Sequence, residues 1–296
     1  MEDLSRLCIH TVTTKPLSLK EAVDAYTARG VTGITVWQDA LASFSDTVAG
    51  GGTAVGAAGG AAPGELRAGA RRARALIRDA GLDTVSLCRG GFFPAADKGG
   101  RARALEQNIT AVEVAAELGA PLVVIVPGAD PALPLAESRN QIAEGMAKTA
   151  DRAAALGVKL AVEPLHPMYA DTRSAINTME AANDLCDRLD HPAVGVAVDV
   201  YHLWWDPHLE EEIRRCGESG RILAFHVCDW RSPTRDLLLD RGLMGEGCID
   251  IKGIRGWVED AGFAGPIEVE IFSSEYWSGD QMEFLDRIVE AYKEHV

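Results

Sequence analysis

Short apolar runs alternate with longer amphipathic segments along the whole chain. The apolar runs are rich in Val, Ile and Leu and predict strands at 6–10, 32–37, 83–88, 121–126, 158–163, 194–199, 221–226 and 266–270. Apolar residues at helical spacing lie between these runs. They predict helices at about 18–29, 65–80, 101–118, 135–155, 173–189, 207–216, 250–261 and 281–293.

This alternation determines the expected fold class. Strands joined by helical crossovers run parallel to one another. Eight such units in 296 residues favour a single closed (β/α)8 TIM barrel over an open doubly wound sheet. No change in composition marks a domain boundary, so we expect residues 1–296 to form one domain. A Gly/Ala-rich stretch at 49–64 predicts a flexible loop, and the charged segment 230–249 predicts a long loop between a strand and a helix.

Four consecutive predicted strands end in side chains that can bind a metal ion: Glu163, Asp199, His226 and Glu270. In a barrel these carboxyl ends meet at one face, where active sites lie. Three crowded carboxylates repel one another unless a cation lies between them. Carboxylate and imidazole ligands without a thiolate favour Mn²⁺, Mg²⁺ or Co²⁺ over Zn²⁺. Glu268 faces the same side of its strand as Glu270 and competes with it as the fourth ligand.

Charge and composition narrow the range of partners. The formal net charge of −15 argues against binding to nucleic acids or anionic membranes, which require a basic surface. No apolar run is long enough for a transmembrane helix, and the first residues lack the features of a signal peptide. The six cysteines are scattered, as is typical of reduced thiols. We therefore expect a cytoplasmic protein.

The segments around the four strand ends resemble the xylose isomerase-like barrel family, most specifically between about residues 158 and 272. The resemblance implies that Glu163, Asp199, His226 and Glu270 bind one divalent metal ion, and it selects Glu270 over Glu268. It also implies that the two ligand glutamates carry protons to and from the substrate. The matching motifs are Val-Glu163-Pro-Leu-His166, Val-Asp199-Val-Tyr-His202, Phe-His226-Val-Cys-Asp229, Gly245-Glu-Gly247 and Gly265-Pro-Ile-Glu-Val-Glu270.

The activity implied by this resemblance is that of a metal-dependent sugar isomerase or epimerase. A cation, with Mn²⁺ expected first, stabilises the enediolate formed when a proton leaves the carbon beside a carbonyl. A carboxylate on each side of that carbon supplies base and acid. The loop after Glu270 lacks the glycines of a barrel phosphate site, so we expect an unphosphorylated keto-sugar.

Three alternatives remain open on the sequence. If a β-substituent leaves, the same site acts as a lyase or dehydratase on a keto-cyclitol or a 3-keto-glycoside, including as a C-glycoside-cleaving barrel subunit with a small partner chain. A nuclease like endonuclease IV shares the barrel but needs more ligands and a basic face. A non-catalytic sugar-binding barrel is disfavoured by the complete set of ligands. Homo-oligomers are usual for the family.

Seven further residues are candidates for the site. His166 is either an additional acid or base or a structural histidine. Asp229 either orients a metal ligand or caps a turn. For the others a substrate contact competes with a structural role: a backbone hydrogen bond, a solvated cation or core packing. Besides His166, the candidates comprise the loop residues His202, Asp229 and Arg231 and the ends of the first three strands, His10, Trp37 and Arg89.

Overall fold

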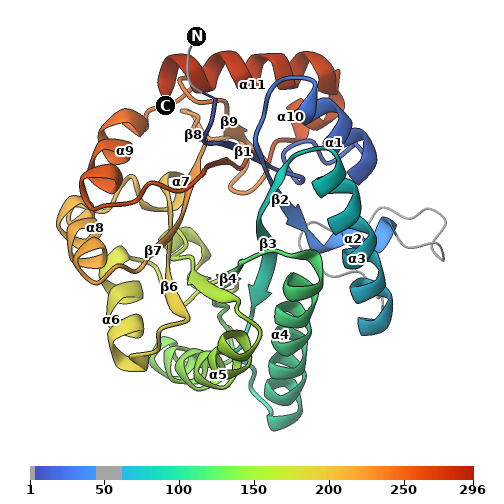
Figure 1. The fold of residues 1–296 in the computed structure, drawn as a ribbon. Helices are drawn as coiled ribbons and strands as arrows, with labels where there is room; N and C mark the ends of the chain where they lie inside the picture. The colour runs from blue at the N-terminus through green and yellow to red at the C-terminus, as the bar shows by residue number, and fades with distance from the viewer. Residues whose placement is uncertain (1–3, 45–61) are drawn as a thin grey trace.

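The structure is a computed structural model that describes residues 4–44 and 62–296. Parallel strands close into a barrel in the order β1, β10, β7, β6, β5, β4, β3, β2, with helices around it (Figure 1). The chain therefore has the (β/α)8 barrel fold that the alternating pattern predicts. The barrel strands are β1 (Leu7–His10), β2 (Gly33–Trp37), β3 (Asp83–Gly91), β4 (Leu122–Val126), β5 (Lys159–Val162), β6 (Val194–Asp199), β7 (Ile222–Val227) and β10 (Ile267–Val269).

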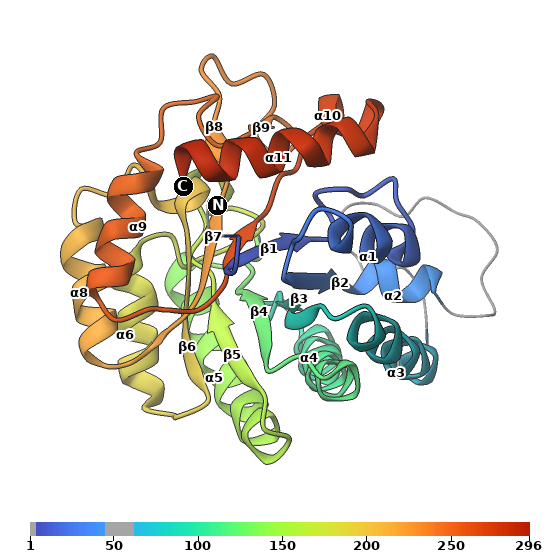
Figure 2. The same ribbon diagram turned by 45° about the horizontal axis from the view of Figure 1, so that its top comes forward.

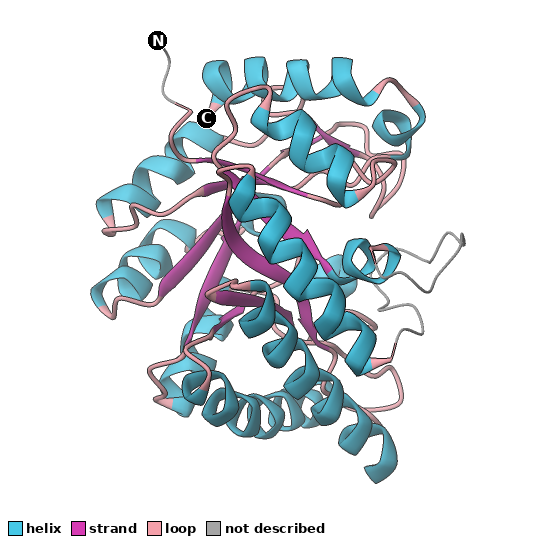
Figure 3. Ribbon diagram, turned by 45° about the vertical axis from the view of Figure 1, so that its right-hand side comes forward, coloured by secondary structure: helices cyan, strands magenta, loops and turns pink. Residues whose placement is uncertain are grey.

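Long helices form the outer layer and cover the strands on all sides (Figure 3). Several begin at a side chain that caps the free backbone N–H groups; Ser18 and Glu21, for example, form the predicted capping box. None of the helices in the described ranges combines the length and the apolarity that crossing a membrane would require. The long helices are α1 (Leu19–Thr27), α3 (Pro63–Asp79), α4 (Lys98–Leu118), α5 (Leu135–Ala155), α6 (Met179–Leu189), α8 (Leu209–Glu218), α9 (Ile251–Asp260) and α11 (Gln281–His295).

Short helices and one β-hairpin lie at the carboxyl ends of the strands. They lie in the loops that follow β2, β5, β6, β7 and β10, so they build the face on which the site is expected. Figure 2 shows the hairpin β8–β9 beside α10, and a bridge between Asp240 and Ser273 connects the two segments. These elements are α2 (Gln38–Ser43), the 3₁₀ helix η1 (Pro167–Tyr169), α7 (Val200–Leu203), β8 (Asp229–Trp230), β9 (Arg241–Gly242) and α10 (Ser274–Ser278).

Side chains inside the barrel change from apolar to polar along the strands. Ala161, Ala197 and Ala224 are fully buried inside, and the inward residue two positions later on each of these strands is a member of the predicted metal quartet. This spacing follows from the two-residue period of a strand. The barrel interior is thus filled by small alanine side chains in its middle and by the larger polar side chains of the quartet at its carboxyl face.

Three predicted boundaries differ from the structure. The helix predicted at 173–189 begins only at Met179, because the Thr178 side chain accepts the N–H of Ala181 and caps it there. Arg89, expected at the start of a loop, lies within β3. The loop predicted at 49–64 falls mainly outside the described residues, and α3 already begins at Pro63.

Gly91 lies in β3 directly beside β4, and Gly81, just after α3, offers a control with an open surrounding. A Cβ added to Gly91 would lie 1.7 Å from the carbonyl oxygen of Val126, whereas one added to Gly81 meets nothing within 4 Å. Both glycines have positive φ angles, so alanine at either position has a backbone cost of about 1–2 kcal/mol. We expect Gly91→Ala to lower the free energy of unfolding by more than about 3 kcal/mol, because β4 must also move. Equal losses for Gly91→Ala and Gly81→Ala in urea denaturation would contradict this.

Candidate metal centre and substrate pocket

Four buried side chains converge at the carboxyl face of the barrel. Glu163 follows β5, Asp199 ends β6, His226 lies near the end of β7, and Glu270 follows β10. Parallel pairing places Asp199 opposite His226 on the neighbouring strand. One ligand atom from each of the four residues lies within 4.8 Å of the others. The tertiary structure thus brings together the quartet that the sequence predicts.

The chemistry of this quartet fits a divalent cation. Among the residues that the structure describes, the buried Asp199 Oδ2 has no hydrogen-bond partner. Burial, opposed by Arg241 and reinforced by Glu163, raises the pKa of Asp199 to about 7. A cation would relieve both features, since it accepts lone pairs and balances carboxylate charge. Three carboxylates and one imidazole, with no thiolate, are ligands typical of Mn²⁺ or Mg²⁺.

A polar layer lies directly beneath the quartet and is centred on Glu268. Its Oε2 atom accepts hydrogen bonds from Thr35 (2.5 Å) and Ser86 (3.2 Å) and lies 3.1 Å from His10 Nε2. His10 Nδ1 in turn lies 3.1 Å from Glu270 Oε1. Glu268 therefore supports the site from below, and Glu270 is the carboxylate in the quartet.

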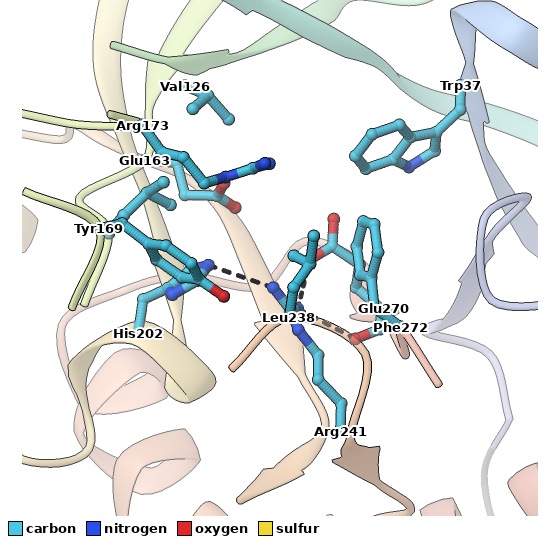
Figure 4. A pocket seen from close by; sticks show the side chains of 11 residues that line it. Trp37, Val126, Glu163, Tyr169, Arg173, His202, Leu238, Arg241, Glu270 and Phe272 are labelled. Carbon is cyan, nitrogen blue, oxygen red and sulfur yellow. Dashed lines mark hydrogen bonds and ion pairs between the residues drawn. The ribbon is translucent and has the colours of Figure 1, made fainter. Parts of the chain in front are cut away.

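A small pocket opens at the quartet and is lined by two of its members, Glu163 and Glu270. Its wall combines apolar and aromatic groups with a few charged ones, as Figure 4 shows. This mixture is typical of sites that bind small polar molecules. The lining residues are Trp37, Val126, Glu163, Leu165, Tyr169, Arg173, His202, Leu238, Arg241, Glu270 and Phe272.

Arg241 is the main site residue that the sequence prediction missed. Its Nη1 atom donates to Glu270 Oε2 (2.6 Å) and lies 3.6 Å from Asp199 Oδ2. Its Nη2 atom lies 3.2 Å from His202 Nε2, and its guanidinium lies over the ring of Tyr201. The only hint in the sequence is an arginine beside a glycine in a charged loop. It reaches the pocket because β9 pairs with β8 directly after β7.

The structure places Arg231 and Asp229 away from the pocket lining. Arg231 forms ion pairs with Glu246 (2.7 Å) and Glu275 (3.0 Å). Asp229 accepts the N–H groups of four loop residues: Trp230, Gly245, Gly247 and Ile249. Of the two roles considered for Asp229, these contacts are those of a residue that organises the loop at 230–249.

Two predicted histidines have different surroundings. His202 is buried and lines the pocket, as expected of a substrate contact, and its Nδ1 accepts the N–H of His166 (3.4 Å). His166 itself lies outside the lining, with its ring beside those of Trp205 and Trp230. Burial lowers the pKa of His166, so its ring is neutral at pH 7. His166, three residues after Glu163 in the sequence, thus does not line this pocket.

The first three strands contribute at different depths. Trp37 lines the pocket, and its Nε1 lies 3.3 Å from His10 Nδ1. His10 is fully buried beneath, so its contacts are with Glu268 and Glu270 and not with the pocket space. Arg89 lies over the ring of Phe92 at 4.1 Å, outside the lining.

Comparison with known proteins agrees with this geometry. The family model for the xylose isomerase-like TIM barrel matches residues 44–288. An inosose isomerase of Bacillus licheniformis is 27% identical over 190 residues, which cover 63% of this chain and 66% of that protein, slightly less than two thirds. A 3-dehydroshikimate dehydratase of Pseudomonas aeruginosa is 25% identical over 86% of this chain, but only over 36% of its own length.

Solved structures share the same architecture. Protein SMc04130 from Sinorhizobium meliloti 1021 is 42% identical, with a TM-score of 0.87 and 98% coverage of both chains. The IOLI protein, whose structure contains a bound zinc atom, is 20% identical, with a TM-score of 0.78 over 97% of this chain and 96% of its own. The second similarity concerns the fold alone.

The metal-free protein should lose stability as the pH rises above neutrality. Burial disfavours charged imidazoles, but the neighbouring glutamates outweigh it and raise the pKa of His10 and His226 from 6.5 to about 9. The resulting stabilisation is complete below pH 6.5 and is lost as the pH passes through about 9. It is on the order of 3 kcal/mol per histidine. Thermal unfolding of chelator-treated protein should show a falling Tm over this range, and His10→Gln should flatten the fall. A constant Tm would refute the prediction.

A second prediction concerns the layer beneath the quartet. Glu268→Gln keeps the shape of the side chain but removes the negative charge beside His10 and His226. Carboxylates that orient metal-binding histidines typically change metal affinity by about 10–100-fold. We expect a loss of that size for Mn²⁺ in calorimetric titration. The exposed Glu211→Gln on α8 is the matched control and should bind like the wild type. Unchanged affinity in Glu268→Gln would show that this layer serves only packing.

Proposed function

The chain belongs to the xylose isomerase-like TIM barrel family, and from that premise we propose that it is a divalent-metal-dependent sugar isomerase or epimerase. Its relatives include isomerases, epimerases and a dehydratase, which supports an enzyme. The observation that carries the proposal is the buried quartet of Glu163, Asp199, His226 and Glu270 at the base of a pocket. The proposed substrate is an unphosphorylated keto-sugar.

The four residues of the quartet would hold the metal ion, for which we propose Mn²⁺ first. When bound, a divalent cation polarises a carbonyl group and stabilises the negative charge that develops when a neighbouring proton leaves. Zinc is a second candidate, because the IOLI protein contains a zinc atom. Mg²⁺ and Co²⁺ suit the same ligands.

Two glutamates are placed to move the proton. Glu163 and Glu270 line the pocket from β5 and β10, which are separated in the barrel by β6 and β7. A substrate between them has a carboxylate on either side of its reacting carbon. One carboxylate takes the proton, and the other returns one to the opposite face or to the next carbon. The first outcome is epimerisation and the second is isomerisation.

Arg241 and His202 prepare the site for this transfer. Although burial opposes ionisation, Arg241 holds the pKa of Glu270 well below its usual range, so Glu270 is ionised and has a free lone pair to accept a proton. Burial, together with Arg241, lowers the pKa of His202, which therefore stays neutral and can share a hydrogen bond with a substrate hydroxyl group. The surrounding Trp37, Leu238 and Phe272 exclude water from the developing charge.

A lyase or dehydratase is the second candidate function. The similarity to a 3-dehydroshikimate dehydratase favours it, since elimination begins with the same proton removal. Elimination also needs an acid that protonates the leaving group. His166 is a candidate for an additional acid or base, but it lies outside the pocket lining. A change in the shape of the β5–α6 loop would be needed before His166 could serve in that role.

Exchange with solvent deuterium tests both candidates. Protein loaded with Mn²⁺ is incubated in D₂O with ketoses, ketocyclitols and 3-keto-glycosides, and the products are analysed by mass spectrometry. We expect deuterium at the carbon beside the carbonyl, together with interconversion of sugars. Release of water or of an aglycone would instead establish the lyase. No exchange with any compound, despite bound metal, would contradict the proposal.

Glutamine variants identify the acid and the base. Glu163→Gln and Glu270→Gln should each lower kcat by about 10²–10⁴-fold, the usual contribution of a positioned acid or base. Metal content must be measured in parallel, because both residues are also proposed ligands. The exposed Glu211→Gln is the control and should retain full activity. Full activity in either pocket variant would remove that glutamate from the mechanism.

A further inference from the structure

The loop between β5 and α6 brings a second arginine, Arg173, to the pocket wall. Its guanidinium points into the pocket in Figure 4 and lies over the ring of Tyr169 at 5.5 Å. Within residues 4–44 and 62–296, no carboxylate lies within 4 Å of this guanidinium, and it donates no hydrogen bond. Building on the proposed function, we propose that the substrate carries a carboxylate group that binds Arg173.

The position of Arg173 is fixed by the backbone. Its N–H donates to the carbonyl of Tyr169 (3.0 Å), and its own carbonyl accepts the N–H of Gly128 (2.9 Å). The next residue, Ser174, forms a bridge with Gly128 after β4. These bonds hold the arginine at the pocket while its charged end has no ion-pair partner among the described residues. A partly buried cation in this state has lost hydration without gaining a counterion, so it favours an anionic ligand.

The other charged side chains that line the pocket already have partners, Glu163 in His226 and Glu270 in Arg241. A divalent cation would balance the charge of two of the three carboxylates in the quartet. The third, Glu270, forms an ion pair with Arg241. Among the described residues that line the pocket, Arg173 is therefore the charged side chain without an ion pair. One uncompensated cation beside the metal centre matches a substrate with a single negative charge.

A carboxylate suits Arg173 better than a phosphate. The planar guanidinium presents two parallel N–H groups that match the two oxygens of a carboxylate. A phosphate dianion usually requires further backbone N–H groups from a glycine-rich loop or a helix terminus, and the loop after Glu270 lacks glycine. The net charge of −15 repels anions from the protein as a whole, so attraction must arise locally. The inferred substrate class is a polyhydroxylated ketone that bears one carboxylate.

Matched ligand pairs test this inference by binding alone. The Mn²⁺-loaded protein is titrated calorimetrically, at constant ionic strength, with D-fructose and D-fructuronate and with D-tagatose and D-tagaturonate. We expect at least one uronate to bind about 10-fold or more tightly than its neutral partner, as a charge-assisted hydrogen bond allows. D-Fructose 6-phosphate is the third probe and should bind less tightly than that uronate.

Variants connect the preference to the residue. Arg173→Gln should abolish the preference for the uronate over its neutral ketose, and Arg173→Lys should keep part of it. Arg214→Gln, on the exposed face of α8, is the control and should behave as the wild type. Thermal unfolding of each variant confirms that it is folded.

The outcomes separate this inference from the proposed function. If no uronate binds more tightly than its ketose, if the phosphate binds best, or if the preference survives in Arg173→Gln, the inference is overturned. Deuterium exchange with neutral ketoses would still support the isomerase in that case. Conversely, a preference that depends on Arg173 but occurs without any exchange would uphold the carboxylate site and reject the proposed reaction.

Discussion

Repulsion among the three carboxylates Glu163, Asp199 and Glu270 is the constraint around which the site is arranged. They lie at the ends of strands, in a buried part of the barrel where charges interact strongly. Without a cation, such a group would hold protons or move apart. The surrounding structure supplies positive groups from two directions, with His10 below and Arg241 at the side. Although burial opposes it, these groups lower the pKa of Glu270 and so keep it charged. Asp199 Oδ2 has no hydrogen-bond partner in the described part of the chain.

The strands and the loops contribute different kinds of residues. The strand ends place the quartet, because parallel pairing holds their side chains in register. The loops place the arginines, one from the hairpin after β7 and one from the segment after β5. Asp229 organises the loop after β7, which carries Arg241, because its carboxylate accepts hydrogen bonds from three backbone N–H groups of that loop. The strand ends can therefore hold the quartet in one geometry while the loops that form the pocket wall vary.

This division explains how one barrel can host several reactions. The relatives of this chain include an inosose isomerase and a 3-dehydroshikimate dehydratase. The later steps of each reaction depend on which groups contact the rest of the substrate. In this chain the pocket wall includes Tyr169, Arg173 and His202, all of which lie in loops or short helices after strands. This part of the wall therefore comes from the segments with the least regular structure.

The sequence by itself determined the barrel and its quartet. A strand has a two-residue period, and a parallel barrel gathers the carboxyl ends of its strands, so residues such as Glu163 and Asp199 could be placed from the pattern alone. Only the tertiary structure decided between Arg231 and Arg241, because both belong to one charged loop whose path depends on the β8–β9 pairing. It also moved Arg173 from a predicted helix to the pocket wall. The position of a loop depends on contacts between segments that are distant in sequence, so it cannot be predicted from a local hydrophobic period.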